Sequence, residues 1–266
     1  MTYEPLILIV PPERLKQVQG LSVLVAHQAY RVGRGPHLFR SGAPVTVRGG
    51  LMAVDDQGFD GRGEASILCD EMVRECAARN FQGVVCRFSG KKKPLLERAV
   101  GELGERFSRR NWRLYVPETY GNCSSYARVM VSSALSGGSL QNRLEEAADR
   151  FGIRRVVLAV ERIAEDFFLP SPNGSGVPLA RRELQEQLEQ RKPSVFFSHE
   201  LCARYFTYMS RESGAHFVLF DDGDTIRKKL QTARGIGVTG AVMALEDVDD
   251  VLDKLNLKRS EKGAGG

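Results

Sequence analysis

The sequence predicts an α/β fold, and within that class a distorted (β/α)8 barrel. From residue 81 to residue 245, short apolar runs rich in β-branched residues alternate with amphipathic segments of helical period. Such runs are typical of parallel strands buried on both faces, and their repetition indicates either a (β/α)8 barrel or a doubly wound sheet. No G-x-G-x-x-G motif follows an early strand, which disfavours a dinucleotide-binding sheet.

The elements of this repeat follow one another in a regular order. The predicted strands cover residues 84–88, 112–116, 128–134, 153–160, 195–197, 216–220 and 239–245. The predicted helices cover residues 94–110, about 140–150, a polar segment ending at 190, and 225–234. Pro94 suits the first position of its helix because its φ angle is already helical. Ser139 directly precedes the next one.

The N-terminal fifth of the chain has a different pattern. The runs 7–10, 22–27 and 45–54 look like strands, but Gly- and Pro-rich loops without a helical pattern separate them. They are either barrel strands whose crossovers lack helices, or hairpins. We therefore expect the irregular part of the barrel to lie here. The tail 258–266 is expected to be disordered.

Composition places the chain among globular proteins of a reducing compartment. Hydrophobic residues make up 42% and charged residues 27% of the 266 residues, and a chain of this length buries about 70–75% of its unfolded surface without help from disulfides or metals. Five cysteines occur without a C-x-x-C pair, and no signal peptide or membrane span is evident. We expect a cytoplasmic protein without a metal or cofactor.

The charge distribution is uneven although the net charge is only +5. Residues 87–113 contain nine Lys or Arg and three Glu, whereas acidic residues gather after 221 and after 246. Such asymmetry can mark an anion-binding face. The interleaved aromatic residues of nucleic-acid platforms are missing, so solvated helix faces are the simpler interpretation and nucleic acid is not the expected partner.

Candidate functional residues stand where catalytic groups of a barrel are found, at the C-terminal ends of the strands. The polar residues at these ends are Arg87, Ser89, Glu118, Ser132, Ser133, Glu161, Asp221, Asp222 and Glu246. Converging carboxylates suit glycoside hydrolysis or metal-assisted chemistry. The four histidines form no H-E-x-x-H or H-x-H motif, and no G-x-S-x-G elbow supports a Ser-His-Asp triad.

Three segments resemble the chitinase-like glycoside hydrolases of family 18, particularly their bacterial spore-cortex-associated branch. The residues HFVLFDDGDTIRKKLQTARGIGVTGAVMALED (216–247) are similar to the end of that branch. FQGVVCRFSG (81–90) stands where the family has D-G-x-D-x-D-x-E, and RVMVSSALSGG (128–138) where it has Met-x-Tyr-Asp. The resemblance spans about 50–255. It implies one barrel domain over 1–257, with a small α+β insertion at about 170–225 before the last strand.

The departures from this family are at its functional positions. Its three Asp and one Glu fall on Gln82, Val85, Arg87 and Ser89. In the family the Glu is the general acid and the N-acetyl oxygen of the substrate is the nucleophile, so losing the acid should cost about 10²–10⁴ in rate. The Tyr-Asp falls on Ser132-Ser133, and the Trp that stacks on a sugar falls near Met243. These changes predict a barrel that no longer performs this hydrolysis.

The leading hypothesis is thus a non-catalytic protein that binds peptidoglycan or another N-acetylglucosamine polymer, or that is structural, and the resemblance allows an association with the spore. The candidate ligand-binding residues are Arg87, Ser89, Ser133 and Glu246. Arg87 and the lysines at 91–93 predict an anionic ligand, such as a muropeptide. Alternatively, Arg87 forms an internal pair with Glu118 or Glu161.

A second hypothesis keeps an active glycoside hydrolase with relocated carboxylates. Its candidate catalytic residues are Glu161, Glu118 and Asp221, and Glu161 is the best of them because it directly ends a buried strand. A retaining enzyme needs two carboxylates about 5 Å apart. These acids can instead pair with nearby arginines. Cys202, which lies among apolar residues, is interpreted as a packed thiol rather than a nucleophile.

Overall fold

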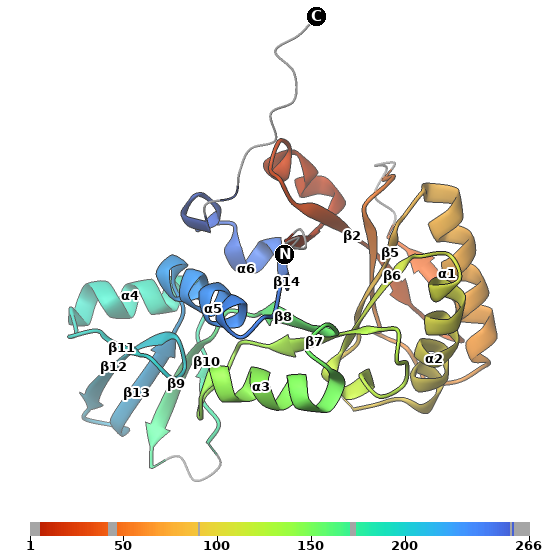
Figure 1. Ribbon diagram of the computed structural model, residues 1–266. Helices are drawn as coiled ribbons and strands as arrows, with labels where there is room; N and C mark the ends of the chain where they lie inside the picture. The colour runs from red at the N-terminus through yellow and green to blue at the C-terminus, as the bar shows by residue number, and fades with distance from the viewer. Residues whose placement is uncertain (1–5, 42–46, 90, 171–173, 256, 258–266) are drawn as a thin grey trace, which may run out of the picture.

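The computed structural model describes residues 6–41, 47–89, 91–170, 174–255 and 257, and in this part of the chain it contains a closed barrel with a second sheet beside it (Figure 1). The parallel barrel strands are β1 (Ile7–Val10), β2 (Leu24–Val32), β4 (Leu51–Asp55), β5 (Gly83–Arg87), β6 (Arg113–Pro117), β7 (Arg128–Ser132), β8 (Val156–Val160) and β14 (Gly240–Ala244). β1 pairs in parallel with both β14 and β2, which closes the barrel. The predicted barrel is confirmed, and its N-terminal strands are parallel members of it. The tail 258–266 lies outside the described residues.

The helices cover the barrel unevenly. The α-helices are α1 (Ala65–Arg79), α2 (Pro94–Ser108), α3 (Leu140–Phe151), α4 (Arg181–Arg191), α5 (Gly223–Gly235) and α6 (Leu245–Val248), and the 3-10 helices are η1 (Pro12–Val18), η2 (Glu118–Tyr120) and η3 (Leu252–Leu255). Within the described residues, three crossovers lack an α-helix. They carry η1, the antiparallel strand β3 (Leu38–Arg40) and η2 instead. The first two lie in the N-terminal fifth, where the irregularity was expected, whereas the crossover with η2 lies outside it.

Local sequence signals fix the ends of several elements. Ser139 caps α3 by accepting the backbone N–H of Asn142, and Asp222 caps α5 by accepting the N–H groups of Asp224 and Thr225. Gly83 opens β5 with a φ of +149°, and a Cβ there would lie 2.0 Å from a backbone oxygen of β6. Only glycine lets these two strands start so close together.

The barrel interior is a packed core. Its inward-facing residues are Ile7, Ile9, Ala26, Leu51, Ala53, Val85, Tyr115, Val157 and Val242. Two larger apolar clusters lie outside the barrel wall, one under α1 and α2 and the other under α3 and α5. Because side chains fill the centre, a ligand can approach the barrel interior only at its two ends.

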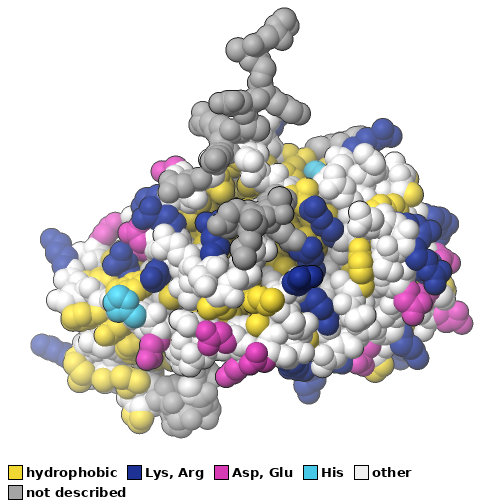
Figure 2. All heavy atoms as spheres, in the orientation of Figure 1, with side chains coloured by type: hydrophobic (Ala, Val, Ile, Leu, Met, Phe, Trp, Pro, Cys, Tyr) yellow, Lys and Arg dark blue, Asp and Glu magenta, His cyan; other side chains and the backbone are white. Residues whose placement is uncertain are grey.

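The second sheet is an insertion between β8 and α5, and it begins at Ala164, before the predicted bound of about residue 170. Its strands pair antiparallel in the order β10 (Val177–Pro178), β9 (Ala164–Leu169), β13 (Gly214–Phe220), β12 (Ala203–Ser210) and β11 (Phe196–Ser198). α4 packs on it through Leu184, which joins a cluster with Phe206 and Val218. Figure 2 shows hydrophobic side chains gathered at the lower left, over this insertion sheet.

One further feature agrees with the sequence prediction. Cys202 is buried, and its thiol contacts the carbonyl oxygen of His199 at 3.5 Å, so the prediction of a packed thiol is confirmed. In the part of the chain that the structure describes, no helix has the length and apolar character to cross a membrane.

Candidate site at the barrel mouth

A cavity of about 450 Å³ opens at the C-terminal ends of the barrel strands. Its polar lining includes Arg87, Ser89, Glu118, Thr119, Ser132, Glu161 and Asp247, and its apolar lining includes Ile9, Phe88, Pro117, Met130 and Met243. Of the seven residues named above as ligand-binding or catalytic candidates, four converge here: Arg87, Ser89, Glu118 and Glu161. The other three, Ser133, Asp221 and Glu246, do not line the cavity.

The β5 side of the mouth is organised by Asp56, which follows β4 and whose side chain is only 1% exposed. One oxygen of Asp56 accepts the backbone N–H of Ser89 at 2.8 Å and its hydroxyl at 3.2 Å. The other oxygen lies 2.5 Å from the ammonium of Lys93, and the backbone N–H of Lys93 is in turn bound by Tyr120. The hydroxyl of Ser89 and the charge of Lys93 are thus both engaged within the protein.

Arg87 extends from the end of β5 towards α6. Its guanidinium lies 3.4 Å from a carboxylate oxygen of Glu246. The internal pair considered for Arg87 therefore exists, but its partner is Glu246 and not Glu118 or Glu161. Lys92 pairs with Glu97, so two of the three loop lysines serve internal contacts.

Glu118 stands at the rim, where η2 begins directly after β6. Its carboxylate pairs with Arg143 and, at 3.9 Å, with Arg150, both on α3. These two guanidinium groups hold Glu118 in place and compensate its charge.

Glu161 and Asp247 form the opposite side of the mouth. Glu161 follows β8 and accepts the hydroxyl of Ser132 at 2.5 Å, and no ion pair to it occurs among the described residues. Burial, together with the nearby carboxylates of Glu246 and Glu161, raises the pKa of Asp247 to about 6, against the opposing charges of Arg87 and Arg181. This side of the mouth carries an excess of negative charge.

Ser133 is buried and supports the mouth from behind. Its hydroxyl lies 3.2 Å from the backbone nitrogen of Glu161 and 3.3 Å from the carbonyl oxygen of the same residue. Ser133 therefore fixes the backbone that carries Glu161 and does not reach the cavity. The structure gives it a positioning role where a ligand contact was expected.

Asp221 lies away from the mouth in a buried ion pair. Its carboxylate contacts the ammonium of Lys229 at 2.5 Å and accepts the hydroxyl of Thr225 and the backbone N–H of Ile163. Asp221 follows β13, an antiparallel strand of the insertion, and so does not end a barrel strand. The structure thus corrects its predicted place at the mouth.

Asp247 was the site residue that the sequence did not single out. Two acids, Glu246 and Asp247, follow the last predicted strand. The strand pattern favoured the first of them as the residue at the strand end. In the structure Glu246 is mostly exposed, with 53% of its side chain accessible, while Asp247 turns towards the cavity. On a short helix, neighbouring residues point in different directions, which the strand pattern could not reveal.

Two other arrangements of polar side chains bear on metal and nucleophile chemistry. Among the described residues, no group of three or more His, Cys, Asp or Glu could hold a metal ion. Ser213, His216 and Asp166 are connected in the insertion, at 2.7 Å and 3.0 Å, in the order of a Ser-His-Asp triad. However, the N–H of Ser213 is bound by Ser210, and none of the three residues lines the cavity at the barrel mouth. We interpret the two hydrogen bonds of this trio as stabilising the β12–β13 hairpin.

The fold is shared with known chitinases and spore enzymes. No family model and no curated protein match the sequence. A chitinase from Chromobacterium violaceum has a similar structure, with a TM-score of 0.69 and 13% identity over 95% of this chain and 98% of that one. For the spore cortex-lytic enzyme SleL of Bacillus megaterium, the TM-score is 0.61 and the identity 13%, over 90% of this chain and 70% of that one. For the putative sporulation-specific glycosylase ydhD of Bacillus subtilis, the TM-score is 0.54 and the identity 15%, over 72% of this chain and 78% of that one. The predicted likeness to family 18 is therefore confirmed at the level of the fold.

Proposed function

We propose that this protein binds an N-acetylglucosamine-containing glycan at the barrel mouth and does not hydrolyse it by the family-18 mechanism. The observation that carries this proposal is the arrangement at the end of β5. There, by the family resemblance, Ser89 occupies the position of the general acid, and its hydroxyl is held by Asp56. A serine hydroxyl so bound has no proton to offer a leaving group at neutral pH.

The mouth has the mixed lining that a sugar requires. Glu161 and Asp247 offer acceptors for sugar hydroxyl groups, and Met130, Met243 and Pro117 offer an apolar surface for the ring. The structural neighbours are named as a chitinase and a spore cortex-lytic enzyme, which supports a glycan as the ligand class.

The charge balance favours a neutral glycan over an anionic one. Arg87 is paired with Glu246, and the other arginine whose charge acts on Asp247, Arg181, is paired with Asp249. Glu161 and Asp247 add negative charge to the lining. An anionic muropeptide, predicted from Arg87 alone, would have to break that pair. We therefore place a neutral chitin-type oligomer first and a muropeptide second.

Calorimetric titration with the N-acetylglucosamine tetramer and with a muropeptide separates these ligands. We expect saturable binding of the tetramer that Glu161→Gln weakens and that added salt changes little. Tighter, salt-sensitive binding of the muropeptide that is lost in Arg87→Ala would favour the anionic ligand. Absence of binding by both would reject the proposed function.

A second candidate function is hydrolysis by a relocated pair of carboxylates. The observation that favours it is the raised pKa of Asp247 near Glu161, because a carboxyl that stays partly protonated near neutral pH can act as a general acid. The other two carboxylates predicted as catalytic are engaged within the protein: Glu118 pairs with Arg143, and Asp221 pairs with the buried Lys229. Turnover of the tetramer that is abolished by both Asp247→Asn and Glu161→Gln would establish this function.

A further inference from the structure

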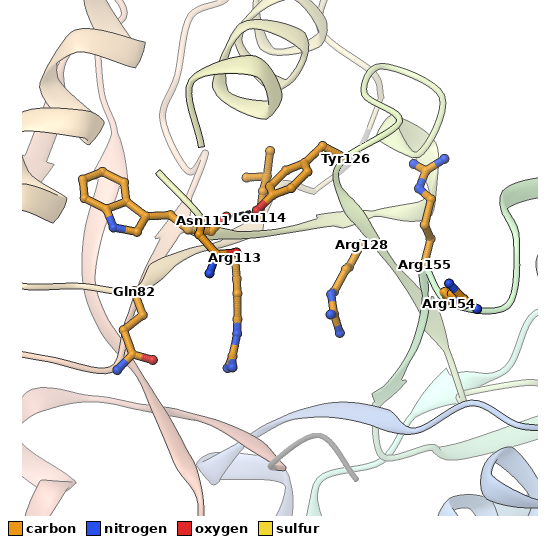
Figure 3. A pocket seen from close by; sticks show the side chains of 9 residues that line it. Gln82, Asn111, Arg113, Leu114, Tyr126, Arg128, Arg154 and Arg155 are labelled. Carbon is orange, nitrogen blue, oxygen red and sulfur yellow. Dashed lines mark hydrogen bonds between the residues drawn. The ribbon is translucent and has the colours of Figure 1, made fainter. Parts of the chain in front are cut away.

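A second cavity, of about 600 Å³, lies at the opposite end of the barrel, where the strands begin (Figure 3). Four arginines line it, Arg113, Arg128, Arg154 and Arg155, together with the amide side chains of Gln82 and Asn111. No Asp or Glu occurs among the described residues that line it. This cavity is therefore rich in positive charge, in contrast to the mouth.

Strand alternation explains why two of these arginines point into the barrel end. Arg113 opens β6 two residues before Tyr115, and Arg128 opens β7 two residues before Met130. Tyr115 belongs to the interior cluster and Met130 packs against it, so the two arginines face the same interior. The guanidinium of Arg128 lies 5.9 Å from the centre of the Tyr115 ring, and Figure 3 shows Arg113 and Arg128 pointing in the same direction.

The other two arginines have different roles. Arg155 donates to the carbonyl oxygens of Gly121, Ser124 and Ala127, and so orders the segment before β7. Arg154 is exposed at the rim, and Figure 3 shows it apart from the inward pair. Burial lowers the pKa of Arg128 and that of Arg155, which is the cost of removing a guanidinium from water.

We propose that this arginine-lined end of the barrel binds a small oligoanion, a molecule with two or more phosphate or carboxylate groups. A guanidinium offers a planar fork of donors that fits either group in a bidentate manner. The cavity volume falls within the roughly 300–1,000 Å³ of small-molecule sites, which is more than one phosphate requires. Clustered cations without carboxylates in the lining also raise the local concentration of anions.

The proposal does not depend on the glycan site. The two cavities lie at opposite ends of a filled barrel and share no lining residue. A protein that binds glycan only, oligoanion only, or both is compatible with this geometry. The two functions can therefore be tested separately on the same full-length chain.

The test is calorimetric titration with pyrophosphate and with citrate at low ionic strength. We expect saturable binding of at least one of them at one site per chain, and the tighter probe identifies phosphate or carboxylate as the preferred group. Arg113→Gln should weaken binding about tenfold or more, because a charge-assisted bidentate contact is lost. Arg98→Gln removes the same charge from an exposed position on α2 and should leave the affinity within about twofold.

Arg113→Lys and Arg154→Gln keep the test decisive if Arg113→Gln does not fold. Arg113→Lys retains the charge without the fork and should give a partial loss, and the exposed Arg154 can be replaced without disturbing the core. No saturable binding of either probe, or equal binding by wild type and Arg113→Gln with a native circular dichroism spectrum, would overturn the proposal. Such a result would assign the arginines to packing of the barrel end.

Discussion

The two sides of the barrel mouth use their polar residues in opposite ways. On the β5 side, Asp56, Ser89 and Lys93 satisfy one another, and the buried carboxylate has a hydrogen-bond donor or a cation on each oxygen. On the β8 and β14 side, burial and the nearby carboxylates of Glu246 and Glu161 raise the pKa of Asp247. Polar groups that satisfy one another stabilise the fold, whereas crowded carboxylates cost stability and remain available to a ligand.

Removing Asp56 should give the largest effect and would test the structural role of the first side. Asp56→Ala leaves the ammonium of Lys93 without its partner and the N–H of Ser89 unsatisfied, so we expect a loss of about 3 kcal/mol in the free energy of unfolding. Urea denaturation measures it. The matched change Glu161→Gln, on the other side, should cost less than about 0.5 kcal/mol. Equal losses at the two positions would contradict the comparison.

Replacing Glu161 should instead affect binding. Glu161→Gln keeps the shape of the side chain and removes its charge, and we expect the affinity for the N-acetylglucosamine tetramer to fall about tenfold, which corresponds to one strong hydrogen bond. Titration calorimetry measures the change. An unchanged affinity would place the ligand elsewhere. Glu118→Gln is a useful control, since the charge of Glu118 is already compensated by Arg143.

Asp247 should make the protein less stable as the pH rises. Its folded pKa of about 6 exceeds the ordinary value of 3.8, so the folded state binds more protons than the unfolded state between these values. The stabilising contribution of this group is present below about pH 4 and is lost as the pH rises through 6. Asp247→Asn should remove this slope and raise the melting temperature at pH 7 by about 2 °C. Thermal unfolding from pH 4 to pH 7 checks it, and a slope that persists in the variant would refute the assignment.

Restoring a carboxylate at position 89 should have the smallest effect on activity. Ser89→Glu alone should give no detectable hydrolysis of chitin oligomers, because Arg87 and Val85 still occupy the other positions of the family motif. The new carboxylate would also lie next to Asp56. Mass spectrometry of the oligomer after incubation checks this expectation. Cleavage by the single variant would show that the mouth retains more of the hydrolytic site than we infer.

The sequence predicted the barrel well because its strands are continuous apolar runs. Strands β9 and β12 were not predicted, since acids, an arginine and exposed aromatics interrupt their pattern. Asp166 on β9 is accommodated only through the side chains of Tyr208 and His216, which come from distant positions. Such tertiary partners cannot be read from a local period.

The site was predicted less completely, for three identifiable reasons. Asp221 was placed at the mouth because HFVLF reads like a barrel strand, although it belongs to the antiparallel insertion. Asp247 was passed over because its orientation depends on the short helix α6. Arg113 and Arg128 stand at the beginnings of strands, whereas catalytic groups of a barrel are expected at the C-terminal strand ends.

The central claim is that the mouth binds a glycan without cleaving it, and calorimetric titration of the wild-type protein with the N-acetylglucosamine tetramer tests it most directly. A single experiment reports both binding and turnover, because hydrolysis adds a continuing heat signal after each injection. We predict a saturable signal with one site per chain that returns to the baseline after every injection. Continuing heat that disappears in Asp247→Asn, or no saturable heat at all, would contradict the claim.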